Sequence, residues 1–417
     1  MNYKILLSTS FIAIGLSAAA QNAATYAITG DGNADFNWMN IRKIDAGNGK
    51  LVNTIFDRLN PKSILADADT KKAVVITGVH NGQAYTTTEY PTATLVAAAA
   101  YDKKNNKLFF TPMRKGQLRW LDLNDKSEKP TYYTLTSTLL NPLNLADEAN
   151  HITRMDIAAD GNGYAITNDG NHLVRFTTGK KTVITDLGNL IDAEKNTNGM
   201  SIHNRCTSWG GDMVADAYGK LYVISASHQV FKVDVDTRIA THLGTITGLP
   251  ATYTTNGAAV DDDGNIIVSC ATSTEGFYKF SIKDMAAVKV EGSEKVYNAS
   301  DLANGNLLFQ KEFDAQRNYS GMPLAPVAAV NADARIFPNP VTANQFRVLF
   351  DGQKAGRYLV AITDLSGRAI MNSMVTITSK VQSETILLNA GIAKGMYLVK
   401  VTDAANQTVF TERIIVQ

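Results

Sequence analysis

Cysteine is scarce in this chain: the 417 residues include only Cys206 and Cys270. Two cysteines so far apart cannot provide the disulfide framework that stabilises small secreted domains. We expect two separate buried thiols, and pairing stays open as the alternative. A metal site built from cysteines is excluded, because it would need more ligands at close spacing. The six histidines are scattered, so each is expected to be a structural or surface residue.

Excess charge is also missing. The chain has 40 basic and 39 acidic residues, which leaves a net charge of +1. This balance gives no electrostatic preference for nucleic acid or for an anionic membrane surface. Beyond the N-terminus, no apolar run approaches the roughly 20 residues that a membrane span requires. With 45% hydrophobic and 19% charged residues, the chain has enough apolar side chains for a large core.

The first 20 residues have the pattern of a secretory signal peptide. Lys4 supplies positive charge, residues 5–16 are mostly apolar, and small residues at 17–20 precede Gln21. The apolar stretch is too short for a membrane anchor. We therefore predict a signal peptide at 1–20 and a mature protein outside the cytoplasm.

Residues 21–313 repeat a short pattern: an apolar run, an Asp with a Gly- or Asn-rich turn, and a β-branched or aromatic run. Residues 156–167 (DIAADGNGYAIT) and 212–225 (DMVADAYGKLYVIS) are two clear copies. The second strands of the units begin near positions 26, 74, 108, 164, 221, 266 and 307. Their mean spacing of about 47 residues is close to that of four-stranded propeller blades.

These repeats predict an all-β fold: a six- or seven-bladed β-propeller, followed by an immunoglobulin-like β-sandwich. The incomplete last repeat predicts that strands from both ends of the propeller region share one blade. Residues 314–334 are rich in Ala and Pro and lack periodicity, which indicates an extended linker. Residues 335–417 form short alternating runs between Gly, Asn and Asp turns, the pattern of an antiparallel sandwich.

Four motifs in the last segment carry a family resemblance. They are FPNP at 337–340, DLSGR at 364–368, GMYLVKV at 395–401 and a basic-then-apolar C-terminus. In this order they resemble the C-terminal sorting domain of the type IX secretion system, which operates in Bacteroidota-type bacteria. The resemblance implies passage across the outer membrane by the type IX translocon, and removal of the domain by the processing machinery. The matching residues are Phe337, Pro338, Asn339, Pro340, Asp364, Gly367, Arg368, Gly395 and Tyr397.

The loops that lead into the innermost strands are the expected ligand site, by analogy with other propellers. The segments at 150–156 and 201–212 are unusually polar and aromatic. Such side chains around a channel mouth can bind a glycan, a peptide or a carboxylate-bearing ligand, with a Trp as stacking surface. In the competing interpretation, two arginines pair with two aspartates between blades and have a structural role. The candidate binding residues are Arg154, Asp156, His203, Arg205, Trp209 and Asp212.

Oxygen-bearing side chains alternate at Asp31, Asn33 and Asp35. This spacing suits a hard cation such as calcium. The loop lacks the later Glu of an EF-hand, and loops rich in Asp, Asn and Gly are also common without a metal. The sequence contains no nucleophile elbow, zinc-protease motif or phosphate loop, and we predict no catalytic residue.

The main hypothesis is an exported, non-catalytic β-propeller that binds a ligand at or near the cell surface, with a C-terminal domain that directs outer-membrane translocation. One alternative is a secreted lyase or hydrolase that degrades polysaccharide or peptide at the propeller mouth. Another is a surface adhesion or structural protein. No nucleic-acid partner is expected. Anchoring and release after export are both left open.

Overall fold

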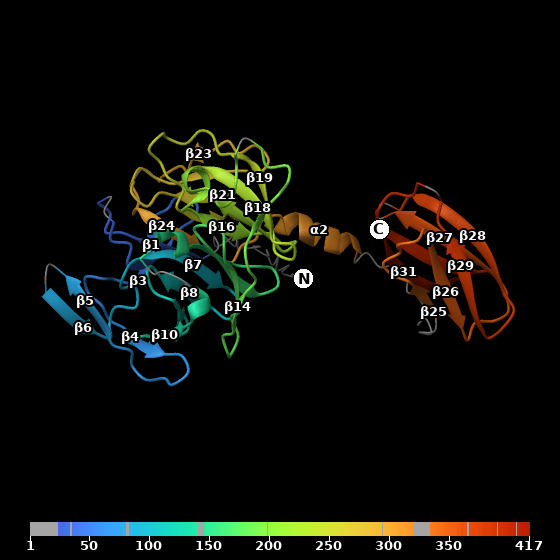
Figure 1. The fold of residues 1–417 in the computed structure, drawn as a ribbon, viewed down its shortest axis with the longest axis horizontal. Coiled ribbons are helices and arrows are strands. Elements are labelled where there is room, and N and C mark those ends of the chain that lie inside the picture. The colour runs from blue at the N-terminus through green and yellow to red at the C-terminus, as the bar shows by residue number, and fades with distance from the viewer. Residues whose placement is uncertain are drawn as a thin grey trace, which may run out of the picture. The chain divides into compact units, whose positions relative to one another are not determined.

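A computed structural model describes residues 24–33, 36–80, 83–140, 146–197, 199–293, 295–320, 334–364, 367–389, 391–405 and 407–417. The predicted signal peptide lies outside these residues. The chain divides into two compact units, Met1–Arg317 and Asn318–Gln417. Figure 1 shows strands in both units, with short helical segments only in the first.

The first unit contains five radial sheets in its described part, which we number as blades 1 to 5. Blade 1 runs from its inner strand outward as β24 (Ala299–Ala303), β1 (Thr25–Thr29), β2 (Asn40–Ile44) and β3 (Leu51–Phe56). Blade 2 consists of β7 (Val96–Asp102), β8 (Lys107–Pro112), β9 (Gln117–Asp122), β10 (Thr131–Thr136) and β4 (Ile64–Asp67).

Blades 3 to 5 follow in chain order. Blade 3 consists of β11 (Ile152–Ile157), β12 (Asn162–Thr167), β13 (Leu173–Thr177) and β14 (Ile184–Asp186). Blade 4 consists of β16 (Asp212–Ala215), β17 (Lys220–Ile224), β18 (Gln229–Asp234), β19 (Ile239–Thr245) and β15 (Ile191–Asp192). Blade 5 consists of β20 (Gly257–Val260), β21 (Ile266–Ser269), β22 (Tyr278–Phe280) and β23 (Val288–Lys289).

The five inner strands close a ring. Their contacts follow the order β24, β7, β11, β16, β20 and back to β24. Strand β24, from the end of the region, pairs with β1 from its beginning, so the predicted sharing of one blade by the two ends is confirmed. Each sheet buries both faces against its neighbours, which explains why β1, β16, β20 and β24 are buried at every position.

The prediction of a propeller followed by a sandwich is confirmed; the described residues form five radial sheets, against the predicted six or seven blades. Two of the seven expected units are not blades in the described structure. The unit near position 74 forms a separate hairpin of β5 (Ile76–His80) and β6 (Gln83–Thr87), and the unit near 307 leads into a helix. The repeat pattern is a local signal, and it does not report whether a strand joins a radial sheet.

That helix, α2 (Gln310–Ser320), replaces the first part of the predicted extended linker. Just before it, buried Leu308 donates its N–H to Ala215 O (3.0 Å) and accepts from Ala217 N–H (2.9 Å) in blade 4. Phe313 of α2 packs edge-on against Tyr218, with ring centroids 5.4 Å apart. The apolar residues 309 and 313 give the segment one packing face, which a search for longer periodicity overlooks. Residues 321–333 lie outside the described chain.

The second unit is a β-sandwich with one apolar core. One sheet consists of β25 (Ala334–Phe337), β26 (Gln345–Asp351) and β29 (Val381–Leu387). The other consists of β28 (Ala369–Ile377), β27 (Gly356–Asp364), β30 (Gly395–Asp403) and β31 (Thr408–Val416). Alternate positions point inward, as in β26, where Phe346, Val348 and Phe350 are fully buried.

Candidate functional site

A cavity of about 330 Å³ lies where loops enter the inner strands, and all five blades contribute to it. This volume is at the lower end of the range typical of small-ligand sites, about 300–1,000 Å³. The lining combines indole rings, guanidinium groups, amides and hydroxyls. We call it the mouth cavity, and its lining residues are Trp38, Ala97, Met113, Arg114, Glu148, His151, Thr153, Asn168, Arg205, Trp209, Gly210, Gly211, Asn256, Ala271 and Ser300.

Arg205 is the first residue of the single-turn helix α1 (Arg205–Ser208), and Trp209 follows its last residue. Asn204 caps this helix by accepting the N–H of Cys206 at 2.9 Å. The Arg205 guanidinium lies over the Trp209 ring, 5.1 Å from its centroid. Its Nη2 also lies 3.4 Å from Oε2 of Glu148, and both partners are largely exposed. An exposed ion pair of this kind is weak, so a ligand can replace Glu148 at Arg205 or Arg205 at Glu148.

The backbone behind Trp209 is held by two glycines. Gly210 and Gly211 have φ values of +67° and +81°, which disfavour residues with a Cβ. A Cβ on Gly211 would lie only 1.9 Å from Ile224 O. The Gly210 N–H donates to Asn168 Oδ1 at 2.9 Å. These contacts hold the loop against blade 4 at Gly211 and against blade 3 at Gly210, and they form one wall of the mouth cavity.

Arg154 does not line the mouth cavity, although the sequence made it a candidate. It is fully buried, and it donates to Gly210 O at 3.2 Å, Thr167 O at 3.2 Å and Ser208 O. Burial lowers its pKa to about 10. In the competing interpretation, Arg154 and Arg205 would pair with Asp156 and Asp212. Instead, Arg154 donates to backbone carbonyls, and Arg205 pairs with Glu148. Arg154 therefore supports the loop behind the cavity.

Asp156 and Asp212 also lie buried rather than in the mouth cavity. Asp156 Oδ2 accepts the N–H of Ala215 at 2.7 Å, on the inner strand of the next blade. Asp212 Oδ2 accepts the N–H of Ala258 in the same way at 2.7 Å. Each carboxyl thus joins two neighbouring inner strands. Burial raises the pKa of Asp156 to about 7 and raises that of Asp212 well above its usual value.

Asp301 on β24 is the third member of this group, which we call the acid belt, and the sequence did not reveal it. Its side chain is fully buried beside the backbone N–H of Ala99 and the carboxyl of Asp212, and neither oxygen makes a hydrogen bond of normal geometry with a described residue. Burial, and next the neighbouring Asp212, raise its pKa well above the usual range. Asp301 stands outside the Asp-Gly turn motif, so no sequence signal marked it.

The two repeat copies at 156–167 and 212–225 begin with Asp156 and Asp212, which predicts equivalent positions for these aspartates, but strand register places them at different positions along their inner strands. Tyr164 and Tyr222 are equivalent, since each donates its hydroxyl to the aspartate of the turn that precedes its strand, Asp160 and Asp216. Asp156 pairs with Tyr164, whereas Asp212 pairs with Ile224 two residues beyond Tyr222. By register, Asp212 corresponds to Arg154.

His203 lies beside the mouth-cavity wall. Its ring nitrogens are 2.6 Å from Asp169 O and 3.2 Å from Leu190 O. Its own carbonyl accepts the Trp209 indole N–H at 3.3 Å. Of the six predicted binding residues, only Arg205 and Trp209 line the cavity. The unpredicted Trp38 and Arg114 come from other loops, where only their residue types could have drawn attention.

Asp31 of the proposed calcium loop is occupied by protein groups. Arg58 Nε donates to its Oδ2 at 2.9 Å, and Asn40 Nδ2 donates to its Oδ1 at 2.9 Å. Asn33 is exposed, and Asp35 lies outside the described residues. Within the described chain, no cluster of three or more His, Cys, Asp or Glu side chains is arranged to hold a metal. Calcium binding here stays a prediction.

The two cysteines are separate thiols. Cys270 is buried as expected, whereas Cys206 is exposed on α1. The exposure follows from the position of Cys206 on the outer side of a single helical turn, which the sequence alone did not reveal.

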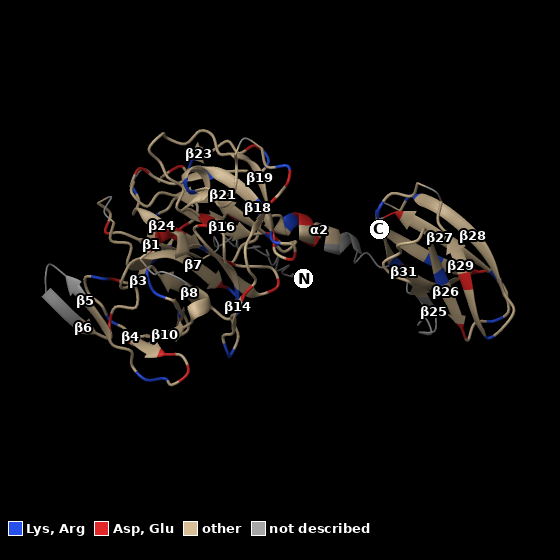
Figure 2. Ribbon diagram, in the orientation of Figure 1, with Lys and Arg blue, Asp and Glu red and all other residues tan. Residues whose placement is uncertain are grey.

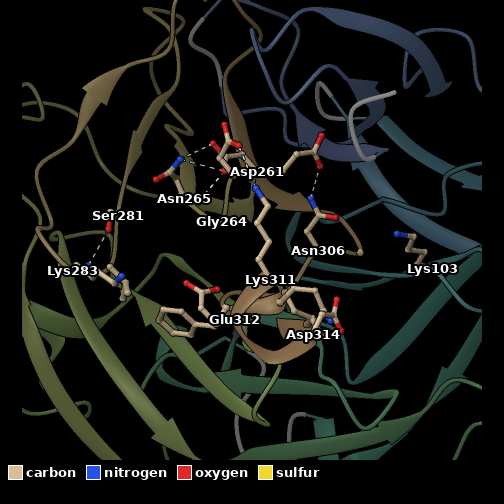
Figure 3. A pocket seen from close by; sticks show the side chains of 17 residues that line it. Lys103, Asp261, Gly264, Asn265, Ser281, Lys283, Asn306, Lys311, Glu312 and Asp314 are labelled. Carbon is tan, nitrogen blue, oxygen red and sulfur yellow. Dashed lines mark hydrogen bonds and ion pairs between the residues drawn. The ribbon is translucent and has the colours of Figure 1, made fainter. Parts of the chain in front are cut away.

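A second cavity, of about 450 Å³, lies where α2 meets the turn between β20 and β21. Figure 3 shows Lys311 extending from α2 towards this turn, where its Nζ lies 3.4 Å from Asp263 Oδ1. Asn306 Nδ2 donates to Asp262 Oδ1 at 2.9 Å. Charges of both signs occur here and over the other loops of the unit (Figure 2). The Lys311–Asp263 pair is exposed and therefore weak, so the packing of Leu308 and Phe313 is the stronger contact of this segment with the propeller.

The sorting motif residues have structural roles in the second unit. Asn339 joins the first motif to the last strand, because its Nδ2 donates to Arg413 O (2.8 Å) and its Oδ1 accepts Ile415 N–H (3.0 Å). Asp364 accepts the backbone N–H of Arg368 at 3.0 Å across the DLSGR turn. Buried Tyr397 donates its hydroxyl to Ala393 O at 2.6 Å. The motifs therefore specify this sandwich.

Residues 335–417 match the family model of the secretion system C-terminal sorting domain. The predicted sorting domain is thus confirmed, and it marks the chain as a substrate for export by the type IX secretion system. No curated protein matches the chain. In the described ranges, every helix is too short or too polar to cross a membrane.

Several solved structures match the chain at low identity and low TM-score. PorZ, a surface component of the type IX secretion system of Porphyromonas gingivalis, is 15% identical with a TM-score of 0.32; the match covers 94% of this chain and 51% of that one. Virginiamycin B lyase from Staphylococcus aureus is 13% identical, with a TM-score of 0.32 and coverage of 55% and 70%. A putative 6-phosphogluconolactonase from Bacteroides fragilis is 11% identical, with a TM-score of 0.35 and coverage of 70% and 99%.

Proposed function

We propose that this protein is an exported binding module whose propeller holds a glycan or peptide ligand in the mouth cavity. The observation that carries the proposal is the convergence of Trp38, Trp209, Arg114 and Arg205 on one cavity formed by all five blades. Aromatic faces beside cationic and amide groups are typical of sites that bind ligands with both apolar and polar surfaces.

A binding role agrees with the chemistry of the lining better than catalysis does. The carboxylate in the lining, Glu148, is exposed and faces Arg205. The aspartates with raised pKa values are buried and joined to backbone amides. Acid–base catalysis requires a titrating group within hydrogen-bond reach of the substrate, and these aspartates lie away from the lining.

Trp209→Ala is expected to weaken ligand retention by about 2 kcal/mol or more, since buried aromatic anchors dominate binding energies. The measurement is screening of the purified full chain on glycan and peptide arrays, followed by calorimetry with the best ligand. Leu59→Ala serves as the matched control, because Leu59 is 71% exposed and does not line the cavity. Equal affinity of the Trp209 variant and the control would contradict the site.

Deletion of residues 335–417 is expected to trap the protein in the periplasm of a host with a type IX system. The reason is that the sorting domain occupies this segment. Fractionation and immunoblotting measure the distribution. As the control, a fluorescent protein with residues 1–20 at its N-terminus and residues 335–417 at its C-terminus should reach the cell surface or medium. Unchanged secretion of the truncated chain would overturn the export route.

A further inference from the structure

Positive side chains outnumber negative ones in the lining of the mouth cavity. Its charged lining residues are Arg114, Arg205 and Glu148. Glu148 lies 3.4 Å from Arg205 in an exposed pair. Arg114, at the turn between β8 and β9 with φ +58°, has no ion-pair partner in the described part of the chain. A ligand that brings its own carboxylate would therefore complete this site.

The remaining lining suits a sugar ring. Trp38 donates its indole N–H to Ala271 O at 2.9 Å, and Trp209 donates to His203 O at 3.3 Å. With these N–H groups engaged, the rings offer apolar faces. Asn256 Oδ1 accepts from Thr254 Oγ1 at 2.6 Å and Ala271 N at 3.0 Å, which leaves its Nδ2 as a donor. A pyranose presents apolar C–H faces and a rim of hydroxyls, so it matches both features.

We propose that the ligand of the mouth cavity is an acidic glycan, with a uronate residue stacked on Trp209 and its carboxylate held by Arg114 and Arg205. This inference rests on the proposed binding function and narrows its ligand class. Guanidinium groups bind carboxylates through charge-assisted, often bidentate hydrogen bonds. The Arg205 guanidinium is already oriented by its position over Trp209, which reduces the entropy lost on binding.

The test uses the purified full chain with uronate oligosaccharides, their carboxyl-reduced counterparts and glutamate-rich peptides, measured by calorimetry. We expect a uronate oligosaccharide to bind, and its reduced counterpart to bind about tenfold more weakly or worse, the value of one charge-assisted hydrogen bond. Arg114→Gln and Arg205→Gln should each weaken uronate binding by a similar factor. Lys115→Gln is the charge-matched control, because Lys115 is exposed next to Arg114 but does not line the cavity.

Each outcome decides a different point. Equal binding of the reduced counterpart, or preference for the peptides, would overturn the acidic-glycan inference while Trp209-dependent binding still supports the proposed function. Uronate binding that both Arg variants retain, or that the Lys115 control loses equally, would also overturn the inference. Failure to bind any glycan or peptide would count against the proposed function itself.

Discussion

Asp301→Asn is expected to raise the free energy of unfolding at pH 7.5 by about 1–3 kcal/mol, because the amide does not have to stay protonated at a pH where the unfolded carboxyl is ionised. Asp301 is fully buried, and burial raises the pKa of its carboxyl well above the usual range. Asp212, the next member of the acid belt, raises its pKa further. An amide at this position carries no charge, and its N–H₂ can donate to the Asp212 carboxyl.

The pH dependence has a definite sign. A carboxyl whose pKa is raised by folding keeps its proton where the unfolded chain has lost it, so stability falls as pH rises between the two values. For Asp156, with a folded pKa of about 7 against 3.8, the loss is about 4 kcal/mol over that interval. Asp212 and Asp301 shift in the same direction. The propeller should therefore be most stable in mildly acidic solution.

Urea unfolding at pH 5 and pH 7.5 measures both effects. Asp301→Asn should unfold at higher urea than the wild type at pH 7.5, with a smaller difference between the two pH values. Asp284→Asn is the control, because Asp284 is exposed and its substitution should change stability by less than about 0.5 kcal/mol. A lower stability of Asp301→Asn at pH 7.5 would show that the carboxylate itself is stabilised by its surroundings.

Arg154→Leu is expected to lower the free energy of unfolding by about 3–5 kcal/mol, as does removal of one partner from other buried charged networks. The change leaves the carbonyls of Gly210, Thr167 and Ser208 without their donor. It also removes the positive charge that faces Asp212. Arg154→Lys should recover only part of the loss, because a single ammonium cannot reproduce the planar fork of donors.

Arg205 provides the matched comparison. Arg205 is largely exposed, with Glu148 as its ion-pair partner, so Arg205→Leu should change stability by about 0.5 kcal/mol or less. Chemical unfolding monitored by tryptophan fluorescence compares the two variants. If Arg154→Leu were as stable as Arg205→Leu, the buried guanidinium would not be holding the loop behind the mouth cavity.

Much of the architecture could be predicted because its signals are local. Turns such as Asp160-Gly161 and the alternation of residues along strands lie within short segments. These signals correctly located the second strand of each of the five blades. The sorting motifs are equally local, since Asn339 and Asp364 act through turns and strand ends. The segment near position 74 has the same local pattern as the blades, which is why the hairpin β5–β6 was counted as a blade. Helix α2 has only a short apolar face, which is why it was overlooked.

The sequence by itself determined the β-rich composition, the blade repeat, the sorting domain and the two cavity residues Arg205 and Trp209. Tertiary structure decided the ring of five blades, the burial of Arg154 and the placement of Asp156, Asp212 and Asp301 on three inner strands of one ring, where their charges interact. The physical reason is that strand pairing and ring closure join residues far apart in the chain, and these contacts determine burial, hydrogen-bond partners and charge. A residue's type is visible in the sequence, but its environment is a property of the closed ring.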